Sequence, residues 1–257
     1  MAEEGRLGVL DGQVAIVTGG GQGIGRGIAL ALSSEGAKVM VLGRTISKCE
    51  AVVEEITARG GTAEAGACDV VRRDQVDASV QRCAGEWGRI DLVVNNAQTT
   101  SYQSLRDLTE VDADAMWQSG PMGALRFMQT CFPWLQEARG CVVNIGSGMS
   151  IQPQAGGAGY GMVKDAMRVL TRVGALEWAG FGIRVNTIVP MALSPLVEEA
   201  ERSTPGTIER LSGLIPLGRL GDAEADIGRS VVYLASDAGR YVTGTTLMVD
   251  GGYRHLG

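Results

Sequence analysis

Histidine is almost absent from this chain of 257 residues, because His255, close to the end, is the only one. This argues against a catalytic triad that uses histidine and against a histidine-rich metal site, so we expect no metal ion. Aromatic residues make up only 5% of the chain, and the five cysteines include no CxxC pair. The first residues, MAEEGRLGVL, are acidic and unlike a signal peptide. An odd number of cysteines in such a chain indicates reduced thiols and a cytoplasmic protein.

Long runs of one class of residue are absent as well. No apolar stretch reaches the roughly 18 residues that a membrane-spanning helix needs, so we expect no membrane partner. The formal net charge is −6, and the basic residues are scattered along the chain. Because nucleic-acid binding needs a basic patch that neutralises phosphates, we expect no nucleic-acid partner either.

Glycine and short apolar runs are what the sequence has in abundance. There are 38 glycines, and hydrophobic residues make up 45% of the chain, enough to bury a large core. Apolar runs alternate with stretches long enough for helices, such as 24–34 and 73–87. Continuous apolar runs bounded by turns are typical of buried parallel strands. They lie at 14–17, 39–42, 62–68, 90–94, 142–145, 185–189 and 247–249. The alternation predicts one α/β domain of the Rossmann type over 1–257: a doubly wound parallel sheet of about seven strands with helices on both faces.

The bounds of the second helix are predicted by two local signals. Ser47 and Glu50 have the spacing of a capping box, which predicts that the helix opens at Ser47. The pair Gly60-Gly61 predicts where it stops, because glycine commonly follows the end of a helix.

A glycine-rich segment, Thr18–Gly25, joins the first predicted strand to the first predicted helix. Glycines allow a tight turn, close approach of the backbone to a pyrophosphate, and close packing of helix on strand. The N-terminus of the helix then offers free N–H groups and a positive dipole end to phosphates. A purely structural turn is the alternative, but the position between strand and helix favours a dinucleotide site. The predicted contacts are Gly19, Gly21, Gln22, Gly23, Ile24 and Gly25.

The end of the second strand bears on which dinucleotide binds. Sites that prefer NAD usually place Asp or Glu there to hold the ribose hydroxyls, whereas this chain has Gly43 and Arg44. An arginine pairs with a 2′-phosphate that a carboxylate would repel. We therefore expect NADP(H) to be favoured over NAD(H), with Arg44 and Thr45 as contacts. The alternative is that Arg44 is a solvated surface side chain.

Tyr160 and Lys164 are four positions apart, so they share one face if they lie on a helix. A neighbouring ammonium favours the phenolate form and lowers the pKa of a tyrosine toward the working range. Such a phenol donates a proton to a carbonyl or accepts one from an alcohol. Ser147 follows the predicted strand 142–145, at the carboxyl end where ligands bind parallel sheets. Ser147, Tyr160 and Lys164 are the predicted catalytic residues.

With these elements in place, the chain resembles the short-chain dehydrogenase/reductase family, in its compact single-domain form, over essentially its whole length. The matching segments are Thr18-Gly19-x-x-x-Gly23-Ile24-Gly25, Asp69-Val70, Asn95-Asn96-Ala97, Asn144-Ile145-Gly146-Ser147, Tyr160-x-x-x-Lys164, Asn186-x-x-x-Pro190 and Gly244…Val249-Asp250-Gly251-Gly252.

The resemblance implies roles around the nucleotide. The glycine segment holds the pyrophosphate and the adenosine ribose. Asp69 and Val70 flank the adenine, while Asn96 and Ala97 lie near the adenosine-side ribose and stabilise the central strand. The backbone amide of Leu193 meets the nicotinamide carboxamide.

The resemblance also implies the chemistry and the assembly. Tyr160 is the general acid and base, and Lys164 binds the nicotinamide ribose and lowers the pKa of the tyrosine. Members of the family usually pair through the helix that carries the tyrosine and close tetramers with the last strand. A homodimer or homotetramer is therefore expected.

Three positions depart from the family pattern, all near the nicotinamide and substrate. Gln98 ends the segment that the family writes Asn-Asn-Ala-Gly, and Met191 follows Pro190 where the family has glycine. Gly120 stands where the family has a catalytic asparagine, at a helix kink whose water relays protons to the lysine. Pro121 removes one helical N–H and bends the helix, so Gly120-Pro121 is expected to keep the kink and the water. The alternative is simple loss of the relay.

The sequence therefore predicts reversible hydride transfer between NADP(H) and a carbonyl/alcohol pair on a small-molecule substrate of small to medium size that is largely apolar. The proline-containing segment 191–216 is expected to form a lid over that substrate. A nucleotide-binding scaffold or sensor with little catalysis is one alternative, motivated by the three departures. A related lyase or epimerase is another.

Overall fold

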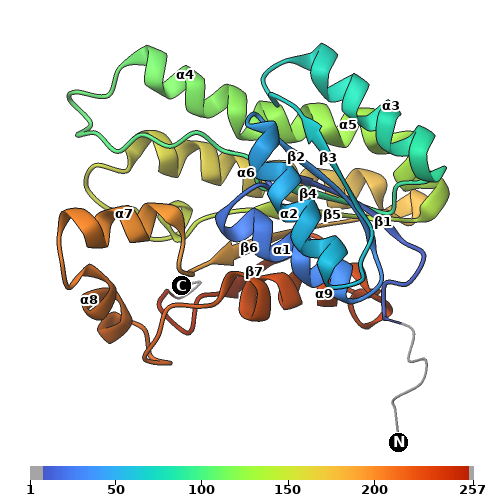
Figure 1. Ribbon diagram of the computed structural model, residues 1–257. Coiled ribbons are helices and arrows are strands. Elements are labelled where there is room, and N and C mark those ends of the chain that lie inside the picture. Colours follow the sequence, from blue (N-terminus) through green and yellow to red (C-terminus); the bar gives the residue numbers. More distant parts are fainter. Residues whose placement is uncertain (1–7, 255–257) are drawn as a thin grey trace, which may run out of the picture.

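The structure is a computed structural model that describes residues 8–254. The acidic N-terminal segment and His255 fall outside this range. Within it, seven parallel strands form one sheet in the order β3-β2-β1-β4-β5-β6-β7, with helices on both faces (Figure 1). The chain reverses its direction of winding between β1 and β4, as a doubly wound sheet does. The predicted Rossmann-type fold is confirmed. The strands are β1 Val14–Thr18, β2 Lys38–Gly43, β3 Ala63–Ala67, β4 Leu92–Asn95, β5 Cys141–Ile145, β6 Arg184–Pro190 and β7 Thr246–Val249.

The helices cover the two faces unequally. Figure 1 shows α3, α4, α5 and α6 on one side of the sheet and α1, α2 and α9 on the other, while α7 and α8 stand at one end. Three 3₁₀ turns and a π-helix, Ala223–Gly228, complete the described elements. The helices are α1 Gly23–Ser34, α2 Ile46–Ala58, α3 Arg73–Trp87, α4 Glu110–Ser119, α5 Pro121–Ala138, α6 Ala158–Trp178, α7 Pro195–Ser203, α8 Thr207–Leu214 and α9 Arg229–Ala235.

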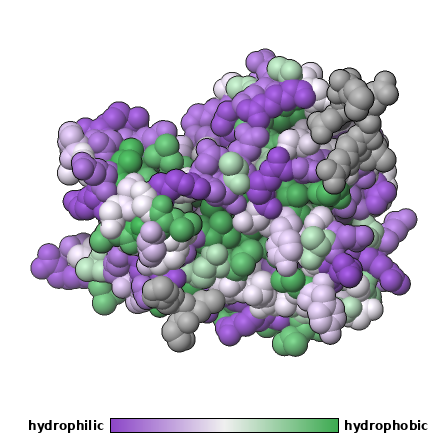
Figure 2. Space-filling model, turned by 90° about the horizontal axis from the view of Figure 1, so that it is seen from below, coloured by the Kyte–Doolittle hydropathy of each residue, from purple (hydrophilic) through white to green (hydrophobic). Residues whose placement is uncertain are grey.

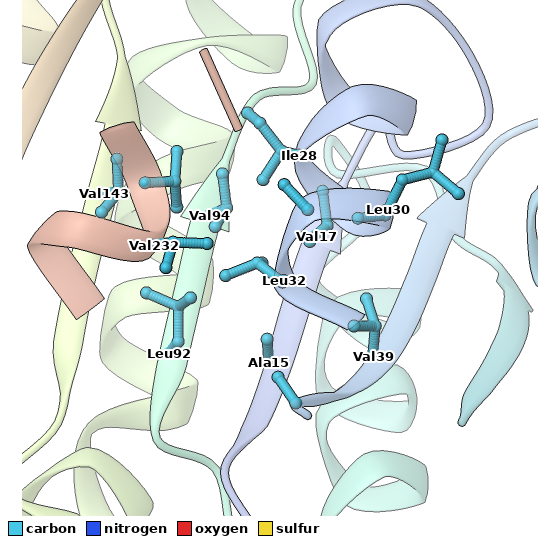
Figure 3. Packing of buried hydrophobic residues seen from close by; sticks show 14 of the residues in the cluster. Ala15, Val17, Ile28, Leu30, Leu32, Val39, Leu92, Val94, Val143 and Val232 are labelled. Atoms are coloured by element: carbon cyan, nitrogen blue, oxygen red, sulfur yellow. The ribbon is translucent and has the colours of Figure 1, made fainter. Parts of the chain in front are cut away.

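Alternate residues of the inner strands β1, β2, β4, β5 and β6 feed two separate cores. Ala15 and Val17 of β1 point to the side of α1, where Ile28 and Leu32 pack against them (Figure 3). Their neighbours on the strand, such as Ile16, point to the opposite side, toward α3 and α5. Because both faces of a strand are buried, the sequence shows a continuous apolar run rather than an alternating one. This is why the strands could be recognised from the sequence.

The second helix does not begin where the capping box predicts. It opens at Ile46, and Thr45 occupies the N-cap position without a side-chain hydrogen bond. Ser47 therefore lies inside the first turn, and the predicted box is wrong, because the chain enters the helix almost directly from β2. The predicted end is confirmed: the helix ends at Ala58, and Gly60 turns the chain with φ +83°.

The last strand leaves one edge of the sheet without a partner in the described chain. Figure 2 views the molecule from the side of β7 and α9 and shows apolar side chains gathered over the middle of that face. All four residues of β7 are only partly buried. No helix within residues 8–254 combines the length and the apolar character needed to cross a membrane.

Candidate active site

A cleft of about 710 Å³ lies at the carboxyl ends of the strands. Its walls are the glycine-rich loop after β1, the end of β2, and the first residues after β3 and β4, with the start of α7 closing one side. Ligands of open α/β sheets bind at this edge, beside the point where the strand order reverses. Every predicted contact from the glycine loop lines the cleft, as do Arg44, Thr45, Asp69, Val70, Asn96 and Ala97.

The glycine loop has no room for side chains at its tightest points. Gly19 has φ +63°, and a Cβ on Gly25 would overlap the carbonyl oxygen of Gly19. Gln22 occupies the N-cap position of α1, and its side chain makes no hydrogen bond to the backbone of the helix. The first turn of α1 therefore keeps its amides for a ligand, which suits an anionic pyrophosphate.

Asn96 clamps the glycine loop from the neighbouring strand. Its side-chain amide donates to the carbonyl oxygens of Thr18 (3.0 Å) and Gly19 (3.1 Å). In return, the Thr18 hydroxyl accepts from the backbone N–H groups of Asn96 and Ala97 at 3.0 and 3.1 Å. These four bonds join the ends of β1 and β4, so Asn96 shapes the cleft whether or not it touches a nucleotide.

A second cation, which the sequence analysis did not single out, stands near Arg44. Lys48 lies on the first turn of α2, and its ammonium donates to the Gln22 side chain at 2.6 Å. Both Lys48 and Arg44 are exposed and line the cleft. The available signal was its place in the sequence, because Lys48 lies on the first turn of α2, which closely follows the end of β2.

Ser147, Tyr160 and Lys164 come together beyond the end of β5. Lys164 is buried, and its Nζ donates to the Ile145 carbonyl at 2.6 Å. The same Nζ lies 5.6 Å from the centre of the Tyr160 ring. The Ser147 side chain hydrogen-bonds Tyr160 and also accepts from the Met149 N–H at 3.2 Å. The strand end and the first turns of α6 thus bring a hydroxyl, a phenol and an amine to one place.

Burial is the main cause of the pKa shifts of Lys164 and Tyr160. It lowers the pKa of Lys164 to about 7, because an ammonium loses its hydration inside the protein. Burial also raises the pKa of Tyr160, as does the nearby Tyr102, while the hydrogen bond with Ser147 acts in the opposite direction. The expectation that Lys164 lowers the pKa of Tyr160 is therefore not met in this structure: the loss of hydration outweighs any attraction to the amine.

Tyr102 is a further residue that the sequence analysis missed. Its ring centre lies 5.7 Å from that of Tyr160, and half of its side chain is exposed. It belongs to the loop after β4, and the next residue, Gln103, bonds to the Gly156 carbonyl of the loop before α6 at 2.9 Å. No local pattern marks a tyrosine in such a loop, because only the contact between the two loops brings it to Tyr160.

The backbone amide of Leu193, which the sequence analysis assigns to the nicotinamide carboxamide, already has another partner. Its N–H already donates to the Gly221 carbonyl at 3.0 Å, so in this structure it is engaged and not free for a carboxamide. The next three residues, Ser194–Leu196, line the cleft instead. Pro195 lies directly over the glycine loop, since a Cβ on Gly23 would be 2.8 Å from its Cδ. Ser147, Tyr160 and Lys164 do not line this cleft among the described residues.

The expected helix kink is present at Gly120. α4 ends at Ser119, Gly120 has φ −90° and ψ −100°, and α5 begins at Pro121. Gln98 fills the space beside the break: a Cβ on Gly120 would overlap its Oε1. Its Nε2 donates to the carbonyl oxygens of Thr99 (2.8 Å) and Met116 (3.0 Å). Two of the three departures from the family pattern are therefore in direct contact.

Comparisons with known proteins agree with this geometry. A family model described as enoyl-(acyl carrier protein) reductase matches residues 19–254. The chain is 37% identical to a 12alpha-hydroxysteroid dehydrogenase of a Clostridium species, covering 96% of this chain and 98% of that one. It is 34% identical to a 3-oxoacyl-[acyl-carrier-protein] reductase of Staphylococcus aureus (93% and 96%) and 35% identical to an L-fucose dehydrogenase of Bos taurus (94% and 89%).

A solved structure is similar over the same length. It is described as a short-chain alcohol dehydrogenase from Sinorhizobium meliloti, and it superposes with a TM-score of 0.86 at 33% identity, covering 95% of this chain and 97% of its own. The chain belongs to the short-chain dehydrogenase/reductase family of oxidoreductases, which use a nicotinamide dinucleotide.

Proposed function

We propose that this protein is an NADP(H)-dependent oxidoreductase that interconverts a carbonyl and an alcohol, with Tyr160 as the proton donor and acceptor. The observation that carries the proposal is the assembly of Ser147, Tyr160 and Lys164 at the same sheet edge as the glycine loop. A hydroxyl, a phenol and an amine placed next to a dinucleotide cleft match the needs of proton transfer coupled to hydride transfer.

The residues present fit a nicotinamide dinucleotide. The glycine cradle excludes side chains where a pyrophosphate needs room, and α1 directs its first amides at that place. When bound, the dinucleotide would supply or accept the hydride. Lys164 has N–H groups beyond the one bonded to Ile145, and these suit a ribose hydroxyl.

The cations at the end of β2 support a preference for NADP(H). Arg44 and Lys48 both line the cleft there, and they would pair with a 2′-phosphate. Among the described residues that line the cleft, the acidic ones are Asp69 and Asp114, and neither lies at the end of β2. A carboxylate that would hold the free ribose hydroxyls of NAD is thus missing from that position.

The protein's own groups complete the reaction. In reduction, the Tyr160 O–H donates its proton to the substrate oxygen as the hydride reaches the carbonyl carbon, and an alcohol results. The Ser147 hydroxyl donates a hydrogen bond to the same oxygen and orients it. Because burial raises the pKa of Tyr160, the phenol holds its proton at neutral pH, as reduction requires. In oxidation, the same group accepts the proton of the alcohol.

The position of segment 191–216 supports its proposed role as a lid over the substrate. It forms α7 and α8, which stand apart from the sheet (Figure 1), and its residues Ser194–Leu196 line the cleft. Its start contacts the glycine loop through Pro195, so movement of α7 would open and close that side of the cleft.

The edge strand β7 supports the expected homodimer or homotetramer. Its residues are only half-buried, so the β7 strands of two copies could pair with each other. A cytoplasmic location stays a prediction.

A non-catalytic nucleotide-binding scaffold is the rival that one observation favours, because the catalytic group does not line the described cleft. Thermal shifts with NAD⁺, NADP⁺, NADH and NADPH at equal concentration come first, since the ligand that binds the folded state more tightly raises the melting temperature more. A substrate panel follows, with a hydroxysteroid, a 3-oxoacyl thioester and an aldose, after the relatives named above. Turnover of a carbonyl or alcohol supports the proposal. Tight binding without turnover on any of them favours the scaffold, and loss of water or epimerisation without net redox change favours the lyase or epimerase.

A further inference from the structure

The serine of the catalytic group sits at the start of a short 3₁₀ turn, Gly148–Ser150. The Ser147 hydroxyl accepts from the Met149 N–H at 3.2 Å, and the Ser147 carbonyl accepts from the N–H and the hydroxyl of Ser150 at 3.1 and 2.7 Å. Residues 147–150 are all half-buried. Because so short a turn has few internal bonds, the place of the Ser147 hydroxyl depends on what holds the turn from outside.

Two arginines from distant parts of the chain hold this turn. Arg168 of α6 donates from Nη1 to the Ser150 carbonyl at 3.1 Å and pairs with Asp165 at 3.0 Å. Arg254, at the end of the described chain, donates from Nη1 to the Gln152 carbonyl at 2.7 Å and lies 3.3 Å from its Oε1. The residues that follow the serine are therefore bonded to α6 on one side and to the C-terminal segment on the other.

The stem of Arg254 lies directly against Gly148, the residue after the serine. A Cβ built on Gly148 would overlap Arg254 Cδ and lie 2.6 Å from its Nε. The backbone of Gly148 is outside the positive-φ region, so its conformation would admit another residue. What requires glycine here is the approach of the arginine. The guanidinium carbon also lies 4.8 Å from the centre of the Tyr253 ring, which favours one position for the charged end.

An ordered turn after β7 brings Arg254 to this place. Asp250 is buried, and its carboxylate accepts from the backbone N–H groups of Gly252 and Arg254 at 3.0 and 2.9 Å. The Gly251 carbonyl accepts from the Leu217 N–H at 3.1 Å, which ties the same turn to the segment after α8. The backbone of Arg254 is thus fixed to the end of β7, and its side chain contacts the serine turn from a rigid base.

We propose that Arg254 is a positioning residue for Ser147: its stem packs on Gly148 and its guanidinium holds the Gln152 carbonyl, so that the serine hydroxyl stays directed at the reacting oxygen of the substrate. This inference rests on the proposed function, in which Ser147 orients that oxygen. Arg254 acts through the backbone of residues 148–152. A misplaced orienting group slows the chemical step more than it weakens binding of the dinucleotide, and this difference makes the role measurable.

Arg254→Met keeps most of the apolar stem and removes the N–H donors. The kcat should fall roughly tenfold. The KM for NADPH should change little, because Arg254 is not among the described residues that line the dinucleotide cleft. Arg254→Lys returns one donor to the Gln152 carbonyl and should recover most of the kcat. Arg240→Met is the matched control and should resemble the wild type, since Arg240 is exposed and donates to the Asp237 carbonyl (3.1 Å) before β7, at the opposite end of that strand.

Two double-mutant cycles test whether Arg254 acts through the serine turn. Once Ser147→Ala has removed the hydroxyl, Arg254→Met should lower kcat by less than about twofold, because nothing is left to position. Gly148→Ala alone should lower kcat as Arg254→Met does, because its Cβ displaces the arginine. In the Arg254→Ala background, where the space is free, the same change at Gly148 should cost little. Independent, multiplying losses in both cycles would overturn the proposal.

Amide hydrogen exchange tests the same inference without any substrate. The N–H groups of Met149 and Ser150, which bond to Ser147, should exchange roughly tenfold faster in Arg254→Met than in the wild type. The Arg26 N–H, in the first turn of α1, should be unchanged. Faster exchange at the two serine-turn amides supports the positioning role even if no substrate is turned over, a result that would refute the proposed function alone. Unchanged exchange there overturns the inference, as does an Arg254→Met enzyme with wild-type kcat.

Discussion

The Lys164 amine lies 5.6 Å from the centre of the Tyr160 ring and bonds to the strand end through the Ile145 carbonyl. This arrangement holds an amine and a phenol on one face of α6, with the lysine side chain buried. Burial disfavours the charged form of the amine and lowers the pKa of Lys164 to about 7.

Lys164 should make the stability of the protein depend on pH. In the unfolded chain a lysine keeps its proton up to about pH 10.4, whereas in the fold Lys164 loses it near pH 7. Between these values the unfolded state binds more protons, so the free energy of unfolding should rise with pH across that window. Lys164→Met removes the buried charge and should raise the free energy of unfolding near pH 6 on the order of a few kcal/mol, with little change near pH 10.

Urea unfolding of both proteins at several pH values measures this difference. Lys38→Met, at the opposite end of β2 from the cleft, is the matched control and should leave the pH dependence as it is in the wild type. A Lys164→Met protein that shows the wild-type dependence would contradict the buried amine. The same variant should also lose turnover, because the amine next to the phenol is gone.

Arg44 and Lys48 should determine the choice between the two dinucleotides. Arg44→Ser removes one cation from the 2′-phosphate position and should raise the KM for NADPH about tenfold or more, while the KM for NADH changes little. Lys48→Ser should act in the same direction. Steady-state kinetics with NADPH and NADH measure the ratio of the two KM values in each variant.

Arg106→Ser serves as the control for this comparison, because the Arg106 side chain is 90% exposed and pairs with its neighbour Asp107. An Arg44→Ser enzyme that keeps the wild-type ratio of the two KM values would refute the assignment of Arg44 to the phosphate.

Gly25→Ala should disable the cleft while Gly85→Ala does not. A Cβ at Gly25 overlaps the backbone of Gly19 and lies 2.5 Å from Asn96 Nδ2, so the loop must move. We expect a loss of roughly 1–3 kcal/mol in stability and loss of the thermal shift with NADPH. Gly85 lies on α3 with no atom within 4 Å of its Cβ position, so alanine there should be neutral or slightly stabilising. Equal effects of the two changes would contradict the proposed cradle.

The sheet and the nucleotide loop could be predicted from the sequence because their causes are local. Strands buried on both faces produce continuous apolar runs, and the tight turn at Gly19 admits little besides glycine. The start of α2 was missed because Ser47 and Glu50 imitate a cap by spacing alone, while the path from β2 decides where the helix opens.

The relation between Gln98 and Gly120 could not be predicted in the same way. Each position looks like a separate loss when it is compared with the family pattern, and 21 residues lie between them. Only the fold shows that one side chain occupies the space that the other lacks. Tyr102 and Lys48 were missed for the same reason, since each reaches the site through a contact between segments rather than through a local motif.

The measurement that tests the account most directly is the hydride-transfer rate of Tyr160→Phe with the best dinucleotide and substrate. Loss of the phenolic O–H should lower kcat by about a hundredfold or more, because it removes the proposed proton donor, while NADPH should still shift the melting temperature. Tyr241→Phe, whose side chain is 99% exposed, is the matched control and should keep full activity. A Tyr160→Phe enzyme that turns over at the wild-type rate would contradict the central claim that Tyr160 moves the proton.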